Sequence, residues 1–155
     1  MGLIKYSASQ FLFDNPAYKK ECLIDYDFKP CLDFVNESAR KRAIFIYTTS
    51  SWRQVGKPVA GAVVKPAKKG CHFVGHAIDF NLFFKGKMYT SKDLDKDNLD
   101  NLPKEIKDFL LECENHPVIR WGGYFRVEDD IHMDSGLNLS DPKKYDEKYK
   151  QYQAT

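Results

Sequence analysis

Residues 70–80 read GCHFVGHAIDF. This stretch places Asp79 seven positions after His72, and a second segment, residues 128–132 (EDDIH), adds His132. Two imidazoles and one carboxylate are a sufficient protein ligand set for a catalytic zinc ion, which then keeps one position for water. The two segments together therefore predict a zinc site formed by His72, Asp79 and His132.

A local break in the backbone is needed to bring His72 and Asp79 together. The alternation of residues 76–84 predicts a β-strand, and in a continuous strand two residues an odd number apart lie on opposite faces. Gly75 can interrupt that regularity because glycine tolerates backbone conformations that are closed to other residues. The small side chain of Ala77 keeps space open beside Asp79. We therefore expect the chain to turn His72 toward Asp79 at Gly75.

Two other uses of these side chains fit less well. His72 and His76 are four residues apart, as in the H-E-x-x-H helix of one class of zinc peptidases. That motif needs a glutamate where this chain has Phe73, and Gly75 weakens a helix. Cys71 and His72 are neighbours, and adjacent residues of an extended chain point apart, so they do not predict a thiol nucleophile with its base. We expect His76 to have a structural role.

The composition is that of a single folded domain. The chain has 155 residues, of which 43% are hydrophobic and 14% aromatic, so we expect one domain over residues 1–155. The 24 basic and 22 acidic residues nearly balance, which gives no electrostatic basis for binding nucleic acid. No apolar run is long enough to cross a membrane, and the first residues do not resemble a signal peptide. We therefore expect a cytoplasmic protein with no nucleic-acid or membrane partner.

The four cysteines are predicted to be free thiols. They are widely spaced, and no C-x-x-C pair suggests a zinc knuckle or a redox motif. A domain of this size does not need disulfides, and unpaired cysteine is among the most commonly buried residues. The four are Cys22, Cys31, Cys71 and Cys113.

An acidic run is a poor match to a calcium-binding loop. Asp93, Asp95 and Asp97 have the spacing that opens an EF-hand loop. Asn98 stands where the loop requires glycine, and Lys104 stands where it requires a bidentate glutamate. We therefore do not expect these aspartates to bind calcium.

Hydrophobic periodicity predicts an α+β fold. Apolar residues at three- and four-residue spacing predict helices over residues 30–41 and 103–114, and β-branched or aromatic runs predict strands. We expect a small antiparallel sheet that carries the zinc site and is flanked by helices. The expected strands are residues 43–47, 76–84, 88–90 and 118–120, with one short helix in residues 1–29, loops over 54–70 and 91–101, and a surface helix or polar tail over 140–155.

The residues of the predicted zinc site and their neighbours resemble the signature of a known family. The pattern H-x-x-G-x-A-x-D at residues 72–79 is similar to that of the D-alanyl-D-alanine carboxypeptidase and L-alanyl-D-glutamate endopeptidase family, the LAS-type metallopeptidases. Asp129-x-x-His132 resembles the second motif of this family. Residues 120–123 (RWGG) are similar to the turn that precedes that motif, and residues 51–53 (SWR) to a strand-end segment. The matched positions follow the order of the family and cover most of the chain.

This resemblance implies a function and a fold. Members of the family are zinc peptidases that cut bacterial cell-wall peptides, and many phage endolysins belong to it. By resemblance, His72, Asp79 and His132 are the zinc ligands. Asp129 is then the catalytic base, and Arg53 faces the carbonyl group of the substrate. The implied architecture is that of the DD-peptidases, which the hedgehog signalling domain resembles.

Three features depart from the family pattern. Gly70 stands where the family usually has a serine, and Met133 replaces a frequent aromatic residue. Glu128, Asp129 and Asp130 are adjacent carboxylates, so the choice of Asp129 as the base depends on its spacing from the last histidine. None of these departures removes a predicted zinc ligand.

The resemblance thus implies a zinc-dependent hydrolase that acts on peptidoglycan. Because the turn at residues 121–123 is most similar to that of the endopeptidase branch, it favours an L-Ala-D-Glu endopeptidase over a D-Ala-D-Ala carboxypeptidase. We expect a monomer whose partner is a peptidoglycan peptide, and which reaches the cell wall by release or by another export route. The alternative is a non-catalytic zinc-binding recognition module of the same fold, against which Asp129 and Arg53 favour an enzyme.

Overall fold

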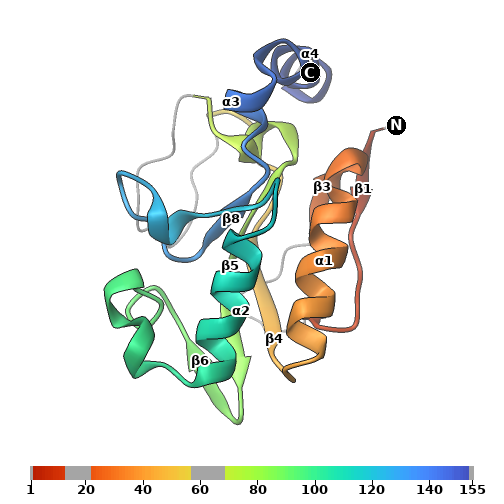
Figure 1. Cartoon of the computed structure of the whole chain (residues 1–155). Helices are drawn as coiled ribbons and strands as arrows, with labels where there is room; N and C mark the ends of the chain where they lie inside the picture. The colour runs from red at the N-terminus through yellow and green to blue at the C-terminus, as the bar shows by residue number, and fades with distance from the viewer. Residues whose placement is uncertain (1, 13–21, 57–68, 154–155) are drawn as a thin grey trace.

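The fold is a mixture of short strands and helices, in agreement with the expected α+β class (Figure 1). The structure is a computed structural model that describes residues 2–12, 22–56 and 69–153. Most of the loop expected over residues 54–70 therefore lies outside the described residues. The described part contains a larger sheet, a two-stranded sheet, two helices that pack against the larger sheet, and two C-terminal helices of which the last packs beside a turn.

The larger sheet has the strand order β2-β4-β5-β8-β7, and β6 pairs with the remaining part of β5. Its described pairings are antiparallel except for that of β2 with β4, which is parallel. The expected antiparallel sheet is therefore found at the centre but not at the β2 edge. The strands are β2 (Phe11–Leu12), β4 (Phe45–Ser50), β5 (Ala77–Phe84), β6 (Lys87–Tyr89), β7 (Arg120–Trp121) and β8 (His132–Asp134).

The alternation of side chains along β5 and β8 separates the core from the predicted site. Ile78 and Leu82 are fully buried in the hydrophobic core, whereas Asp79 lies on the opposite face of β5. On β8, Met133 enters the same core and His132 lies on the face of Asp79. The antiparallel register pairs Asp79 directly with His132. The pairing of these two strands therefore brings two predicted ligands together.

Helices α1 (Lys29–Arg40) and α2 (Lys104–Glu114) pack on the core face of the sheet and contact each other (Figure 1). Both lie within a residue of the ranges expected from periodicity at each end. Proline stands near the start of each, where its missing N–H costs nothing. Their buried residues follow a spacing of three or four positions and are Cys31, Leu32, Val35, Ser38 and Ala39 on α1 and Ile106, Phe109, Leu110 and Cys113 on α2.

The N-terminal segment contains strands that were not expected. β1 (Leu3–Lys5) and β3 (Leu23–Asp25) form the two-stranded antiparallel sheet, and β2 joins the larger sheet. The helical structure described here is one short turn, η2 (Tyr26–Phe28). The prediction missed these strands because two or three residues are too few for an alternating pattern to be recognised.

The strand expected at residues 43–47 begins and ends later, as β4. Ala43 has a positive φ of 56°, which turns the chain after α1 and excludes this residue from the strand. The strand then continues through the threonines to Ser50. The expected polar loop over residues 91–101 contains a 3-10 helix, η4 (Lys96–Asn101).

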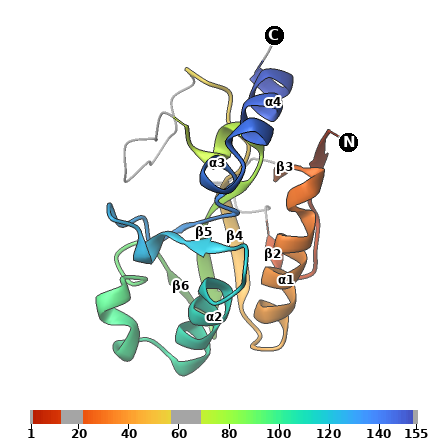
Figure 2. The ribbon, with the colours of Figure 1, turned by 45° about the horizontal axis from the view of Figure 1, so that its top comes forward.

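The C-terminal residues form α3 (Leu137–Ser140) and α4 (Pro142–Gln153), so the segment expected as a surface helix or polar tail is helical. α4 lies beside the yellow-green turn η3 (Cys71–Val74), as Figure 2 shows. Tyr145 packs with Val74 in a second, smaller hydrophobic cluster. One side of α4 is therefore buried although the helix is polar in composition, because tyrosine side chains supply its apolar contacts.

Replacing Gly75 tests the close approach of η3 to β3. Gly75 has φ 73°, and a Cβ added there would lie 2.4 Å from the backbone nitrogen of Asp25. We expect Gly75→Ala to lower the free energy of unfolding, measured with urea, by about 3 kcal/mol. Gly86 has φ 79° with nothing within 4 Å, so Gly86→Ala should cost about 1 kcal/mol from backbone strain alone. Equal losses of unfolding free energy in the two variants would contradict a steric clash at Gly75.

Candidate metal centre

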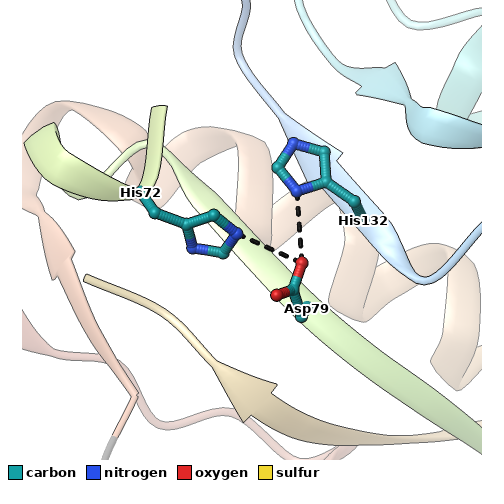
Figure 3. Close-up of side chains that lie close together, drawn as sticks. All are labelled: His72, Asp79 and His132. Atoms are coloured by element: carbon teal, nitrogen blue, oxygen red, sulfur yellow. Dashed lines mark hydrogen bonds and ion pairs between the residues drawn. The ribbon is translucent and has the colours of Figure 1, made fainter. Parts of the chain in front are cut away.

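The three predicted ligands come from three segments and converge on one point (Figure 3). His72 lies in η3, which ends at the left-handed residue Gly75 before the chain enters β5. Asp79 lies on β5 and His132 is its partner on β8. The break at Gly75 is therefore the feature that brings His72 to the same side as Asp79, as its position in the sequence indicated.

The ligand atoms are close enough to share one ion. Nε2 of His72 lies 3.1 Å and Nδ1 of His132 lies 3.2 Å from Oδ1 of Asp79. One ligand atom from each of the three residues lies within 4.8 Å of the other two. The histidines are only 6% and 7% exposed, so the cluster is nearly closed to solvent. His72, Asp79 and His132 form a buried cluster that could bind a metal ion.

The remaining nitrogen of each histidine has a partner that selects its tautomer. Nδ1 of His72 lies 2.6 Å from the carbonyl oxygen of Ser51, to which it donates, so Nε2 is the atom left for a metal ion. Nε2 of His132 lies 2.7 Å from Oδ2 of Asp134, which leaves Nδ1 for the metal. Carbonyl and carboxylate partners of this kind are typical of metal-binding histidines. The donor set and its outer partners thus fit zinc.

Asp134 supports the cluster through His132, a role that was not predicted from the sequence. Its carboxylate receives two hydrogen bonds from Arg120, Nε to Oδ1 at 2.8 Å and Nη2 to Oδ2 at 3.0 Å. The backbone nitrogen of Gly136 donates a further bond at 2.8 Å. These donors fix the carboxylate that orients His132. The signal was present, since Asp134 lies two residues after His132 and therefore on the same face of β8.

Arg53 lies at the cluster and contacts one of its ligands. Its guanidinium group donates to Oδ2 of Asp79, and its Nε donates to Oγ of Ser50 at 2.8 Å. The arginine thus binds one oxygen of Asp79 while the two histidines approach the other. Burial opposes the charge of Asp79, but His72 and His132 outweigh burial and hold its pKa well below the ordinary range.

Asp129 lies beside the cluster, on the side of Nδ1 of His132, which is the nitrogen that faces Asp79. Oδ2 of Asp129 lies 3.9 Å from Nδ1 of His132. Burial, followed by the nearby charge of Asp79, raises its pKa. The backbone of Gly122 packs so closely that a Cβ there would lie 2.1 Å from the carbonyl oxygen of Asp129. The turn after Trp121 therefore fixes the position of Asp129, and only glycine fits at this contact.

The two neighbouring carboxylates belong to a different group. Asp130 and Glu128 lie together with Asp95 in a second, more exposed acidic cluster. Burial and the charge of Glu128 raise the pKa of Asp130 to about 7. Among the three adjacent acids, Asp129 is thus the one directed toward the histidines.

The aspartates that resemble a calcium loop stabilise turns. Oδ2 of Asp93 accepts from the backbone nitrogen of Thr90 at 3.0 Å. Oδ1 of Asp95 accepts from the backbone nitrogen of Asp97 at 2.8 Å at the start of η4. Within the described residues, these three aspartates do not form a common cluster of ligands.

The surroundings of His76 and Cys71 indicate structural roles for both residues. His76 is 4% exposed; its Nε2 lies 2.7 Å from Oδ2 of Asp25 and its Nδ1 lies 2.8 Å from Oγ of Ser135. Burial raises the pKa of the Cys71 thiol to about 12, which disfavours the thiolate that a nucleophile needs. All four cysteines are buried and unpaired, as the sequence analysis expected.

Comparison with known proteins gives no assignment. No family model matches the sequence, and no curated protein matches it. Within the described ranges, no helix combines the length and the apolar composition needed to cross a bilayer. The function has to be inferred from the cluster and its surroundings.

Removal of one imidazole tests the ligand set. We expect His72→Ala to abolish stoichiometric zinc binding, because only two of the three protein ligands remain. Equilibrium dialysis and metal analysis measure the zinc content. His116 packs on Phe34 and lies outside the cluster, so His116→Ala should bind one zinc ion per chain. Tight zinc binding by the His72 variant would refute the assignment.

The affinity for zinc should depend on pH through His132. Burial opposes its charge, but hydrogen bonds to Asp134 and Asp79 outweigh burial and raise its pKa to about 9 in the metal-free protein. At pH 7 the ion must displace this proton, so affinity should rise about tenfold per pH unit up to that pKa. Calorimetry in buffers of different ionisation enthalpy should detect release of the proton. A zinc affinity that does not change with pH over this range would contradict a protonated His132 in the metal-free protein.

Proposed function

We propose that this protein is a zinc-dependent peptidase that hydrolyses the stem peptides of peptidoglycan. The observation that carries the proposal is the placement of Asp129 beside a buried cluster of two histidines and an aspartate. Three protein ligands leave a fourth position for water in a catalytic zinc site, whereas structural sites use four protein ligands. The resemblance of residues 72–79 and 129–132 to the LAS-type metallopeptidases supports the same conclusion.

His72, Asp79 and His132 would hold the ion. When bound, zinc would supply Lewis acidity for a peptide carbonyl and would lower the pKa of a water molecule toward about 7. Asp129 would accept a proton from the attacking water and deliver it to the leaving amine. Its raised pKa suits both steps, because a base that must later act as an acid works best with a pKa nearer the operating pH.

Arg53 would have two roles. Its contact with Asp79 would orient a ligand, and its positive charge, held at the cluster by that contact, would stabilise a substrate carbonyl oxygen that becomes negative there. Fixed charges of this kind stabilise the transition state because they need no rearrangement during the reaction. The side chain is only 13% exposed, so bulk water screens its charge weakly.

The finer assignments follow from the resemblance. We propose a DD-peptidase-like fold, also similar to the hedgehog domain, in which the central antiparallel strands carry the zinc site. The turn at residues 121–123 favours L-Ala-D-Glu endopeptidase over D-Ala-D-Ala carboxypeptidase activity. An enzyme of this type would act as an endolysin on the cell wall.

Replacing Asp129 separates metal binding from chemistry. We expect Asp129→Asn to keep stoichiometric zinc and to lower the rate of peptide cleavage by about 10²–10⁴-fold, since the base is removed and the ligands remain. Glu128→Gln is the matched control because it alters the adjacent carboxylate in the second acidic cluster, and it should retain activity. Undiminished turnover by the Asp129 variant would remove Asp129 as the base.

Digestion of peptidoglycan distinguishes the enzyme from a recognition module. The zinc-loaded protein should release new free amino groups from Gram-negative peptidoglycan, and mass spectrometry of the fragments should identify the bond cleaved. A zinc-loaded protein that binds this material without releasing amines would instead be a recognition module of the same fold.

A further inference from the structure

The end of α4 is connected to two segments that carry residues of the candidate site. The side-chain amide of Gln153 makes three hydrogen bonds to the backbone. Its Nε2 donates to the carbonyl of Arg53 at 2.8 Å and to that of Phe73 at 2.9 Å. Its Oε1 accepts from the backbone nitrogen of Val55 at 2.8 Å. A flipped amide would set its oxygen against two carbonyls, so these bonds define one orientation.

Both segments bear groups of the cluster. Phe73 directly follows His72, and Arg53 donates to Asp79 through its guanidinium group. The backbone nitrogen of Arg53 also donates to the carbonyl of His72 at 3.1 Å. Gln153 therefore supports the same pair of segments that this bond joins.

Regular structure does not fix these segments. Residues 51–56 follow the end of β4, and His72 lies in the short turn η3 that precedes β5. Neither segment takes part in a described strand ladder, so their relative position depends on individual hydrogen bonds such as those of Gln153.

α4 is itself held firmly enough to act as a support. Nζ of Lys148 lies 2.9 Å from Oδ2 of the fully buried Asp25, and the hydroxyl of Tyr152 donates to the same carboxylate. The hydroxyl of Tyr145 donates to the carbonyl of Gly70 at 3.0 Å, just before η3. The helix is thus anchored on both sides of the turn that carries His72.

We propose that Gln153 is a positioning residue, which holds the backbone of His72 and Arg53 in the arrangement that the metal ion requires. This role rests on the proposed metal-dependent function of the cluster. Gln153 acts through backbone groups of Arg53, Val55 and Phe73 and is not one of the candidate metal ligands. Outer partners of metal ligands typically contribute 10–100-fold to metal affinity.

The test compares three variants of the whole chain. Gln153→Met keeps similar volume but removes all three hydrogen bonds, and Gln153→Glu keeps the acceptor while directing a carboxylate oxygen at two carbonyls. Gln151→Met makes the same substitution at an exposed position of the same helix and is the matched control. A residue that only fills space would be replaced by Met without loss. We expect both Gln153 variants to bind zinc about tenfold more weakly than the wild type, and Gln151→Met to bind it normally.

Cobalt supplies a second readout that is independent of peptide cleavage. We expect the visible absorption spectrum of the Co²⁺-loaded protein to change in both Gln153 variants, because the position of His72 changes. Thermal unfolding of the metal-free variants checks that each is folded. Wild-type zinc affinity and an unchanged cobalt spectrum in both Gln153 variants would overturn the positioning role alone. A wild-type chain that binds no zinc would overturn it together with the proposed function.

Discussion

The carboxylate of Asp79 is the group on which the candidate site depends. A buried charge is costly unless hydrogen bonds and opposite charges compensate it. Here His72 and His132 approach one oxygen, and Arg53 donates to the other. These contacts bring together η3, β8 and the segment after β4, all around one residue of β5. The two histidines lower the pKa of Asp79, and their contacts together with that of Arg53 hold four parts of the chain around one carboxylate.

The sheet keeps this polar cluster apart from the hydrophobic core. Alternate residues of β5 and β8 enter the core beneath α1 and α2, and the residues between them reach the cluster. A shift of one residue in the register of β5 and β8 would exchange the two faces. Met133 and Ile78, which are fully packed in the core, therefore help to specify which face carries His132. The apolar pattern and the candidate metal site are two results of one strand pairing.

The features that depend on a local sequence pattern were predicted best. The periodicity of α1 and α2 located both helices, and the spacing around Gly75 led to a cluster of His72, Asp79 and His132. The short strands β1 to β3 were missed because tertiary contacts, not an alternating pattern, define them. Gln153 could not be found either, since its partners are backbone groups, which are nearly the same for every residue type. Asp134 could have been found from its two-residue spacing on β8.

The anchoring of η3 by α4 has a consequence for how the protein is made. Ribosomes synthesise the chain from its N-terminus, so all three candidate ligands are incorporated before residue 153. Until α4 emerges and docks, the carbonyl groups of Arg53 and Phe73 lack the amide that joins them. A chain in which α4 has not yet docked therefore contains all three candidate ligands without the bonds of Gln153. For a hydrolase, full activity would then wait for the docking of this helix.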